Sequence, residues 1–353
     1  MLMKHIFLSL FTISLLSCSQ QKNIAALDPN ALKPAVVTEK VPFDTDDPAI
    51  WVHPTDKSQS LVIGTDKETG GGLYAFDLNG KIVRKVVGLQ RPNNVDIAYG
   101  VMLGGQKKDL AIVTERETNK VRFFSLPDMQ EAGAGLEVFE GEAARKPMGI
   151  AVYTRPSDNA SFVVVGRKTG PSGSYLWQYR ILDEKGQPAM QLVRKFGAYS
   201  GKKEIESIAV DNENGYIYYS DEQAGIHKYH ADPAKGNEEL AFFGQKDFKE
   251  DIEGISFYKF TDGTGYIVVS DQQANRFNFY PREGSKYNSH EHARIASLPF
   301  STQESDGSET TSVSLPGFPG GLFVAMSTNR TFQYYRWADI AKAAGLRALN
   351  AAE

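Results

Sequence analysis

Charged residues recur in this sequence at corresponding points of a repeated pattern, in the polar elbows that follow short β-rich runs. The elbows are basic in the first three repeats and acidic or amide-bearing in the next two, with the side chains Lys67, Arg116, Arg167, Lys168, Asp221, Glu222, Asp271 and Gln272. A set of fixed cations is a receptor for a doubly charged oxyanion, and phosphate is the obvious candidate. The basic elbows therefore predict a phosphate site.

A second polar set stands just before short alternating strands and is rich in acids and amides: Asp46, Asp47, Asn93, Asn94, Glu206, Asp251 and Glu253. Carboxylates crowded together without partners are destabilising, and the usual relief is a hard cation bound through oxygen. The six histidines are scattered and Cys18 is the only cysteine, so the sequence offers no zinc or copper cluster. We therefore predict a site for several calcium ions.

Calcium beside Lys67, Arg116 and Lys168 would suit the hydrolysis of a phosphomonoester. The metal can bridge phosphate oxygens and acidify a water molecule. The three basic side chains can stabilise the charge that builds up in an in-line displacement. Hydrolysis of a phosphomonoester is therefore the predicted reaction.

One segment type recurs six times along the chain: a β-rich run, a polar elbow and a second β-rich run that contains aromatic residues. The copies begin about 50 residues apart, which is close to the length of a propeller blade, at Leu61, Leu110, Phe162, Tyr216, Tyr266 and Leu322. A short alternating strand precedes each copy, and hairpin turn signals occur at Asn79-Gly80, Asn214-Gly215 and Asp262-Gly263. Each repeat therefore holds at least three strands.

The predicted fold class is all-β, as a six-bladed β-propeller, because radial repetition of small sheets leaves only short, protected edges. A sandwich or jelly roll is the competing architecture, but neither needs six similar units at this period. The one clear helical pattern runs from Trp337 to Leu349.

Propeller geometry predicts where the polar residues go. The innermost strand of a blade and its neighbour are antiparallel, so residues before the first and after the second lie on one face of the disc. We expect both polar sets to ring one mouth of the axial channel, with one side basic and the other acidic.

Composition excludes some classes of protein. The chain has 353 residues, of which 41% are hydrophobic, and can bury a large core. Its 39 lysines and arginines against 43 acids give a net charge of −4, which argues against a nucleic-acid partner.

The amino terminus is typical of an exported lipoprotein. Lys4 precedes an apolar stretch too short to span a bilayer, and Leu15 to Cys18 fit a bacterial lipobox. We expect a signal peptide over residues 1–18 with acylation at Cys18, a tether over 19–40 and the propeller over 41–353. The alternative is a plain cleaved signal. The expected location is the outer membrane, with the lipid anchor as the only membrane contact.

Three motifs make this sequence resemble the β-propeller phytases: DDPAIWVHP from Asp46, NNVDIAYG from Asn93 and DIEGISFY from Asp251. These are calcium-dependent, six-bladed enzymes of the 3-phytase type that remove phosphate from myo-inositol hexakisphosphate (phytate). The resemblance runs from about Phe43 to Ala341. It implies attack on phosphorus by a metal-activated water, without a covalent enzyme intermediate.

The resemblance also implies roles for individual residues. Calcium ligands match Asp47, Asn94, Asp96, Glu206, Glu222, Asp251, Glu253 and Gln272, and Asp306 is available as a further ligand. Phosphate would be gripped at Lys67, Arg116 and Lys168, with Arg167 beside them. Asp46 falls next to the attacked phosphate, and the expected catalytic set is Asp46, Lys67, Arg116, Lys168 and Glu222.

Three positions depart from the family pattern. Met148 stands in place of a tyrosine that the family offers to substrate, and Thr169 in place of an acid after the third elbow lysine. Ser327 stands where the family commonly has aspartate. These departures leave room for altered substrate choice.

The sequence is also compatible with two other functions. Lactone-hydrolysing propellers also hold calcium in the axial channel, but their sites are not ringed by lysine and arginine. A non-enzymatic binding module is the other alternative, because fold does not fix function. The expected partner is phytate or another small phosphorylated substrate, and the chain is expected to be a monomer.

Overall fold

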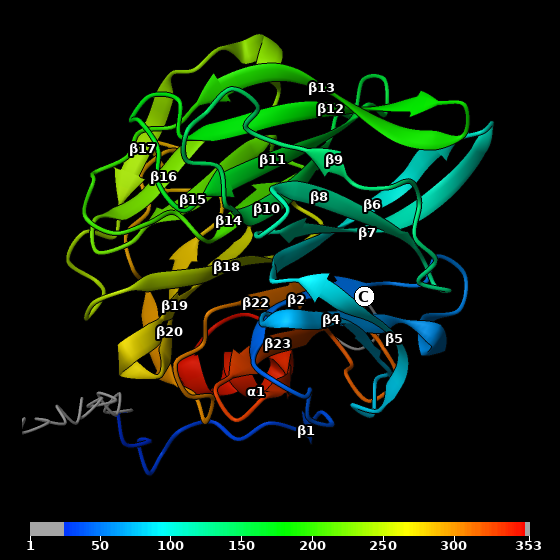
Figure 1. Ribbon diagram of the computed structural model, residues 1–353. Coiled ribbons are helices and arrows are strands. Elements are labelled where there is room, and N and C mark those ends of the chain that lie inside the picture. The colour runs from blue at the N-terminus through cyan, green and yellow to red at the C-terminus, as the bar shows by residue number, and fades with distance from the viewer. Residues whose placement is uncertain (1–24, 350–353) are drawn as a thin grey trace, which may run out of the picture.

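The computed structural model describes residues 25–349, which fold into six four-stranded sheets with antiparallel pairing throughout. The sheets are arranged as the blades of a propeller (Figure 1). The predicted all-β, six-bladed architecture is confirmed. The predicted signal peptide, Cys18 and residues 19–24 lie outside the described residues.

The first three blades follow one another along the chain, and in each the strands run in order from the axis outward. Blade 1 contains β2 (Thr45–Trp51), β3 (Leu61–Asp66), β4 (Thr69–Phe76) and β5 (Ile82–Gln90). Blade 2 contains β6 (Pro92–Leu103), β7 (Gln106–Glu115), β8 (Lys120–Ser125) and β9 (Leu136–Glu137). Blade 3 contains β10 (Pro147–Thr154), β11 (Ser161–Arg167), β12 (Leu176–Glu184) and β13 (Gln187–Phe196).

The next two blades repeat this order, and the last one is completed from the other end of the chain. Blade 4 contains β14 (Ile208–Asp211), β15 (Tyr216–Asp221), β16 (Gly225–His230) and β17 (Glu239–Phe243). Blade 5 contains β18 (Ile252–Lys259), β19 (Gly265–Asp271), β20 (Arg276–Pro281) and β21 (Ala296–Pro299). Blade 6 contains β22 (Ser308–Thr311), β23 (Leu322–Ser327), β24 (Thr331–Arg336) and β1 (Val36–Val37).

β1 closes the ring. Val36 pairs with Tyr334 and Val37 with Gln333, which makes β1 the outer strand of blade 6. In Figure 1 the blue β1 accordingly lies near the red C-terminal helix. Residues 19–40 were expected to be a tether, but Val36 and Val37 belong to the propeller, because they form backbone pairs with the outer edge of β24.

Apolar side chains fill the spaces between neighbouring blades. Six buried clusters are present in the described chain, one for each pair of adjacent blades, including the pair of blade 6 and blade 1. Strands that are covered on both faces read as continuous apolar runs rather than as alternating ones. β11 is an example, since all of its residues are buried.

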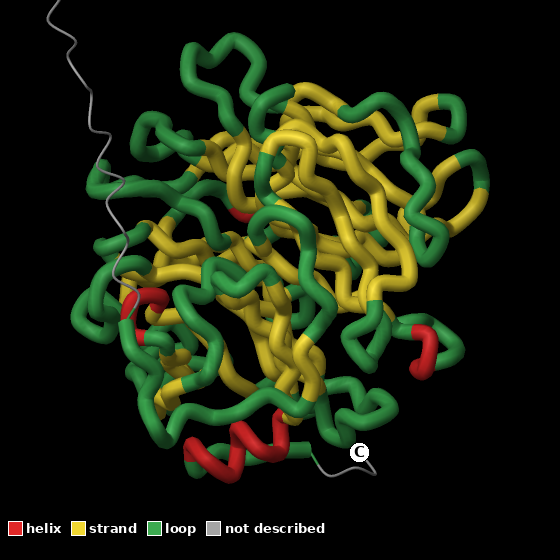
Figure 2. The backbone as a smooth tube through the Cα atoms, turned by 60° about the horizontal axis from the view of Figure 1, so that its bottom comes forward, coloured by secondary structure: helices red, strands yellow, loops and turns green. Residues whose placement is uncertain are grey.

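Helices are few and lie outside the sheets (Figure 2). Within residues 25–349, three short 3-10 helices span Lys57–Gln59, Pro233–Lys235 and Gln272–Ala274, and α1 spans Trp337–Ala344. The predicted helix over residues 337–349 is present but ends five residues early, because Gly345 adopts a left-handed backbone with φ 67°. None of the helices in residues 25–349 has the length and apolar character to span a membrane.

Candidate active site at the propeller mouth

Two rings of side chains meet at one end of the channel. In blades 1, 2, 3 and 5 the first residue of the innermost strand pairs with the last residue of the second strand, as Thr45 pairs with Asp66. The residues next to such pairs therefore lie at the same end of the disc. One ring is Asp46, Asn93, Met148, Glu206, Glu253 and Asp306, and the other is Lys67, Arg116, Lys168, Glu222, Gln272 and Thr328.

The last residue of each second strand points away from this mouth. Asp66 accepts a hydrogen bond from the backbone N–H of Asp44 at 2.7 Å, and Asp221 accepts one from Ser200 at 2.6 Å. Asp271 accepts a hydrogen bond from the backbone N–H of Lys249, and the hydroxyl oxygen of Ser327 accepts one from the backbone N–H of Gln303. Successive side chains of a strand face opposite ways, so these residues hold the incoming loops while their successors face the mouth. Asp221 and Asp271, which were expected to ring the mouth, therefore do not.

Arg167 also occupies this loop-holding position. Its guanidinium donates to Glu142 at 2.9 Å and to the carbonyl oxygen of Ser174 at 3.2 Å, and lies over the ring of Phe139. The side chain is 1% exposed. The structure thus places Arg167 inside blade 3, apart from the other basic residues predicted to bind substrate.

Lys67 joins the first blade to the last. Its ammonium lies 3.1 Å from Asp46 Oδ1 and 2.5 Å from Asp306 Oδ2. Burial lowers the pKa of Lys67, but the attraction of Asp46 and Asp306 outweighs it and raises the pKa well above its ordinary value. Lys67 is therefore charged at physiological pH.

Arg116 lies beside Asn93 and Glu206. Its Nη2 donates to Asn93 Oδ1 and is 4.0 Å from Glu206 Oε1, while Asn93 Nδ2 donates to the same Glu206 oxygen at 2.5 Å. The buried Nε of Arg116 has no hydrogen-bond partner within residues 25–349. Arg116 thus retains a free donor at the mouth.

Lys168 completes the basic side. Its ammonium pairs with Glu204, and the lysine itself is exposed. The residue that follows it, Thr169, is also exposed. In the same blade Met148 takes the ring position of Asp46 and is buried, so blade 3 adds an apolar surface where its neighbours add polar groups.

The acidic side contains a cation that sequence reasoning missed. Lys203 Nζ lies 2.6 Å from Glu222 Oε2 and 2.6 Å from Asp251 Oδ2. The amides of Gln223 and Gln273 also donate to Asp251, at 2.9 and 2.7 Å. Asp251 is thus fully engaged with protein groups.

Several buried carboxylate oxygens at the mouth lack a donor. Asp46 Oδ2, Glu222 Oε1 and Glu253 Oε2 have no hydrogen-bond partner within the described chain. Burial, and then repulsion from Glu222 and Glu206, raises the pKa of Glu253 well above its usual range, while burial raises the pKa of Glu222 to about 8. Such oxygens need a proton or a metal ion.

One group of acids in residues 25–349 is close enough to share a single ion. Carboxylate oxygens of Glu204, Glu206 and Glu222 lie within 4.8 Å of one another. Burial, and then repulsion from Asp306 and Glu204, raises the pKa of Glu206, although Lys67 opposes the shift. An all-oxygen donor set with unpartnered neighbours fits calcium.

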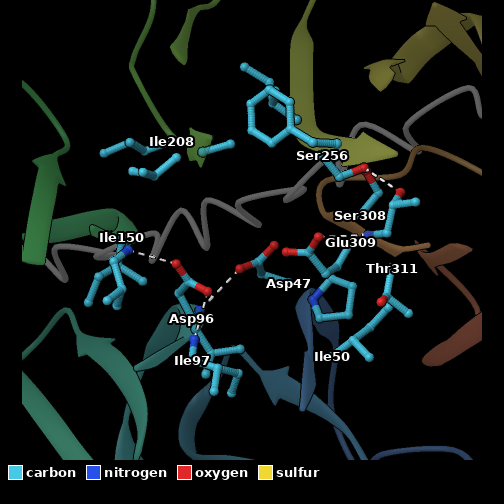
Figure 3. A pocket seen from close by; sticks show the side chains of 18 of the residues that line it. Asp47, Ile50, Asp96, Ile97, Ile150, Ile208, Ser256, Ser308, Glu309 and Thr311 are labelled. Atoms are coloured by element: carbon cyan, nitrogen blue, oxygen red, sulfur yellow. Dashed lines mark hydrogen bonds between the residues drawn. The ribbon is translucent and has the colours of Figure 1, made fainter. Parts of the chain in front are cut away.

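A second acidic group lies inside the channel, below the mouth. The channel is a cavity of ≈ 240 Å³ lined by all six innermost strands, and Figure 3 shows the carboxylates of Asp47, Asp96 and Glu309 directed into it. Backbone N–H groups of the channel wall donate to each of the three. Burial raises the pKa of Asp96 to about 6 and that of Glu309 to about 8. Asn94 lines the same channel, so the predicted ligands Asp47, Asn94 and Asp96 form a deeper group than the rest. Glu309 joins this group and was not predicted from the sequence.

The remaining predicted ligand, Gln272, lies at the mouth. It donates to Asp306 and accepts a hydrogen bond from Gln273 at 2.6 Å. The structure therefore brings together eleven of the predicted residues at the mouth, namely Asp46, Lys67, Asn93, Arg116, Lys168, Glu206, Glu222, Asp251, Glu253, Gln272 and Asp306.

A motif in the repeats could have located the missed acids. An acid two residues before the mouth ring occurs three times, in Asp44-Thr-Asp46, Glu204-Ile-Glu206 and Asp251-Ile-Glu253. In extended chain, residues two apart share a face. Glu204 could thus have been assigned to the site by comparison with Asp251. Nothing comparable marks Lys203.

Comparisons with known proteins give the family and the fold of this chain. The sequence profile of the Phytase family matches residues 2–346. The chain is 28% identical over 319 residues to a 3-phytase of Bacillus subtilis (strain 168). The aligned region covers 85% of this chain and 81% of that relative. A solved luciferin-regenerating enzyme superposes with a TM-score of 0.52 at 11% identity, over 85% of this chain and 95% of that one, which concerns the fold alone.

Proposed function

This chain belongs to the phytase family, and from that premise we propose that it releases phosphate from phytate in a calcium-dependent reaction at the propeller mouth. One observation carries the proposal. The cations of Lys67, Arg116 and Lys168 lie around the same opening as buried carboxylates whose oxygens lack donors. This pairing suits a negatively charged substrate that arrives together with a metal ion.

The residues that would hold calcium are Glu204, Glu206 and Glu222, with Glu253 and Asp306 beside them. Bound there, calcium would neutralise substrate charge and lower the pKa of a water molecule. The deeper acids of the channel would hold a separate ion that stabilises the fold.

The basic residues would exchange partners when substrate binds. In the structure Lys67 pairs with Asp46 and Asp306, and Lys168 pairs with Glu204. A phosphate group offers these cations a better acceptor, while the released carboxylates become free for the metal. Charge in the mouth stays balanced, so phosphate and calcium would favour each other's binding.

Asp46 would handle a proton. Burial raises its pKa well above the usual range against the opposing effect of Lys67, which occupies Oδ1. Oδ2 has no donor in the described chain. In its ionised form, Asp46 would use this oxygen to accept a proton from the attacking water.

Three substrates test the proposed reaction class. We expect phosphate release from phytate and from p-nitrophenyl phosphate, and no hydrolysis of a lactone. The lysines and arginine at the mouth favour a dianion over a neutral ester. Lactone hydrolysis without phosphate release would contradict the proposal, and no turnover of any of the three substrates would favour a binding module.

The neighbours Arg167 and Lys168 should respond differently to substitution. Arg167→Met removes buried hydrogen bonds and should lower the free energy of unfolding by about 2 kcal/mol. Lys168→Met, at an exposed site, should change it by less than about 0.5 kcal/mol yet lower turnover of phytate at least about tenfold. Denaturant unfolding and phosphate release measure the two effects. Equal losses of stability would contradict the assignment.

For the amino terminus we propose acylation at Cys18 and anchoring to the outer membrane. Cys18→Ser should then move the protein from the membrane fraction to the soluble fraction, which immunoblotting of the two fractions measures. A mutant that still sediments with membranes would contradict the lipobox interpretation.

A further inference from the structure

The acidic side of the mouth already contains a cation of its own. Lys203 lies in the segment between β13 and β14, and its ammonium is 2.6 Å from one oxygen each of Glu222 and Asp251. Both carboxylates are buried, at 0% and 6% exposed. A divalent ion that used these two acids would take the place that the ammonium now holds.

Two ion pairs and a hydrogen bond to Asp251 hold the ammonium of Lys203 there. Its side chain is 38% exposed and reaches the acids from the solvent side. Glu222, in contrast, belongs to the group with Glu204 and Glu206 that could share one ion, and its other oxygen, Oε1, has no donor in residues 25–349. Glu222 is therefore shared between the lysine on one side and the candidate calcium site on the other.

We propose that Lys203 is a built-in competitor for calcium. In the calcium-free protein it neutralises Glu222 and Asp251 and keeps the mouth stable. Calcium can use these carboxylates only after the ammonium has swung out, because two cations so close together repel each other strongly in a partly buried site. The lysine thereby raises the calcium concentration at which the site fills. This inference rests on the proposed calcium dependence.

The decisive variant is Lys203→Met, which keeps most of the length of the side chain and removes its charge. We expect the chelator-treated variant to bind calcium at least about tenfold more tightly than the wild type, or to bind one ion more, in isothermal titration calorimetry. Lys203→Arg should bind calcium like the wild type. Lys202→Met is the matched control, because Lys202 is exposed and, within residues 25–349, its ammonium donates only to the carbonyl oxygen of Gln223.

Thermal unfolding separates competition from an ordinary structural ion pair. In chelator, Lys203→Met should melt below the wild type, since Glu222 and Asp251 lose their counter-charge. In saturating calcium this difference should vanish or reverse. A variant that melts lower by the same amount under both conditions, with unchanged calcium affinity, would overturn the inference. Should Lys203→Met fail to fold, Lys203→Gln gives the same comparison.

These readouts do not depend on catalysis. If phytate is not hydrolysed but the calcium titration responds to Lys203→Met as expected, the proposed function fails and the inference stands. If phosphate release depends on calcium but Lys203→Met leaves the calcium affinity unchanged, only the inference fails.

Discussion

Stripping the protein of calcium is expected to lower phosphate release from phytate by at least about 1,000-fold, equivalent to about 4 kcal/mol in the barrier. Without the metal, the unpartnered oxygens of Glu222 and Glu253 face a substrate that is itself highly charged. The measurement is phosphate release by protein verified metal-free by elemental analysis, before and after calcium is returned. Magnesium, which gives up its waters reluctantly, should restore little activity.

The same acids give this effect a pH dependence. Burial raises the pKa of Glu222 to about 8 although Lys203 opposes the shift, so this carboxylate binds a proton more readily than an exposed one. Calcium must displace that proton, and its affinity should therefore rise as the pH increases toward 8. Calorimetry in buffers of different ionisation enthalpy would detect the released proton. Full activity in metal-free protein would contradict the proposed mechanism.

Replacing Arg116 with methionine should lower kcat/KM for phytate by roughly 100- to 1,000-fold, the usual effect of losing one donor to developing charge. Arg116 is the basic residue at the mouth whose donors are least engaged. It contacts Asn93, lies 4.0 Å from Glu206 and keeps a buried Nε with no partner in the described chain. A bound phosphate would satisfy that group.

Two further variants control this experiment. Arg116→Lys keeps the charge but not the planar fork, and we expect an intermediate loss. Arg84→Met removes an exposed arginine on β5 and should leave kinetics unchanged. Unfolding midpoints should agree among all three variants and the wild type. Wild-type kinetics for Arg116→Met would remove this residue from the site.

Much of the architecture could be predicted because it repeats. The six segments mark the second and third strands of the blades, and antiparallel pairing brings Asp46, Lys67 and Glu253 to one end without any knowledge of their contacts. The fourth strand of blade 6 could not be recognised in the same way. β1 has only two residues, and its partner, β24, lies almost 300 positions later in the chain.

Single positions within the elbows were harder to predict. A shift of one residue along a strand reverses the direction of a side chain. Arg167 and Lys168 are both basic and adjacent in the sequence, yet Arg167 pairs with Glu142 and Lys168 with Glu204. Lys203 stands at a position that is Phe43 and Glu250 in the corresponding segments of other repeats, so the repeat does not mark it. Its place between two acids is set by the tertiary fold alone.

The closure of blade 6 by β1 also orders events in time. Among the strands of residues 25–349, β24 is synthesised last, so β1 must wait for nearly 300 further residues before its partner exists. Lys67 of blade 1 likewise meets Asp306 only when blade 6 exists. A chain truncated before blade 6 would therefore lack both the β1–β24 pairing and the Lys67–Asp306 contact at the mouth.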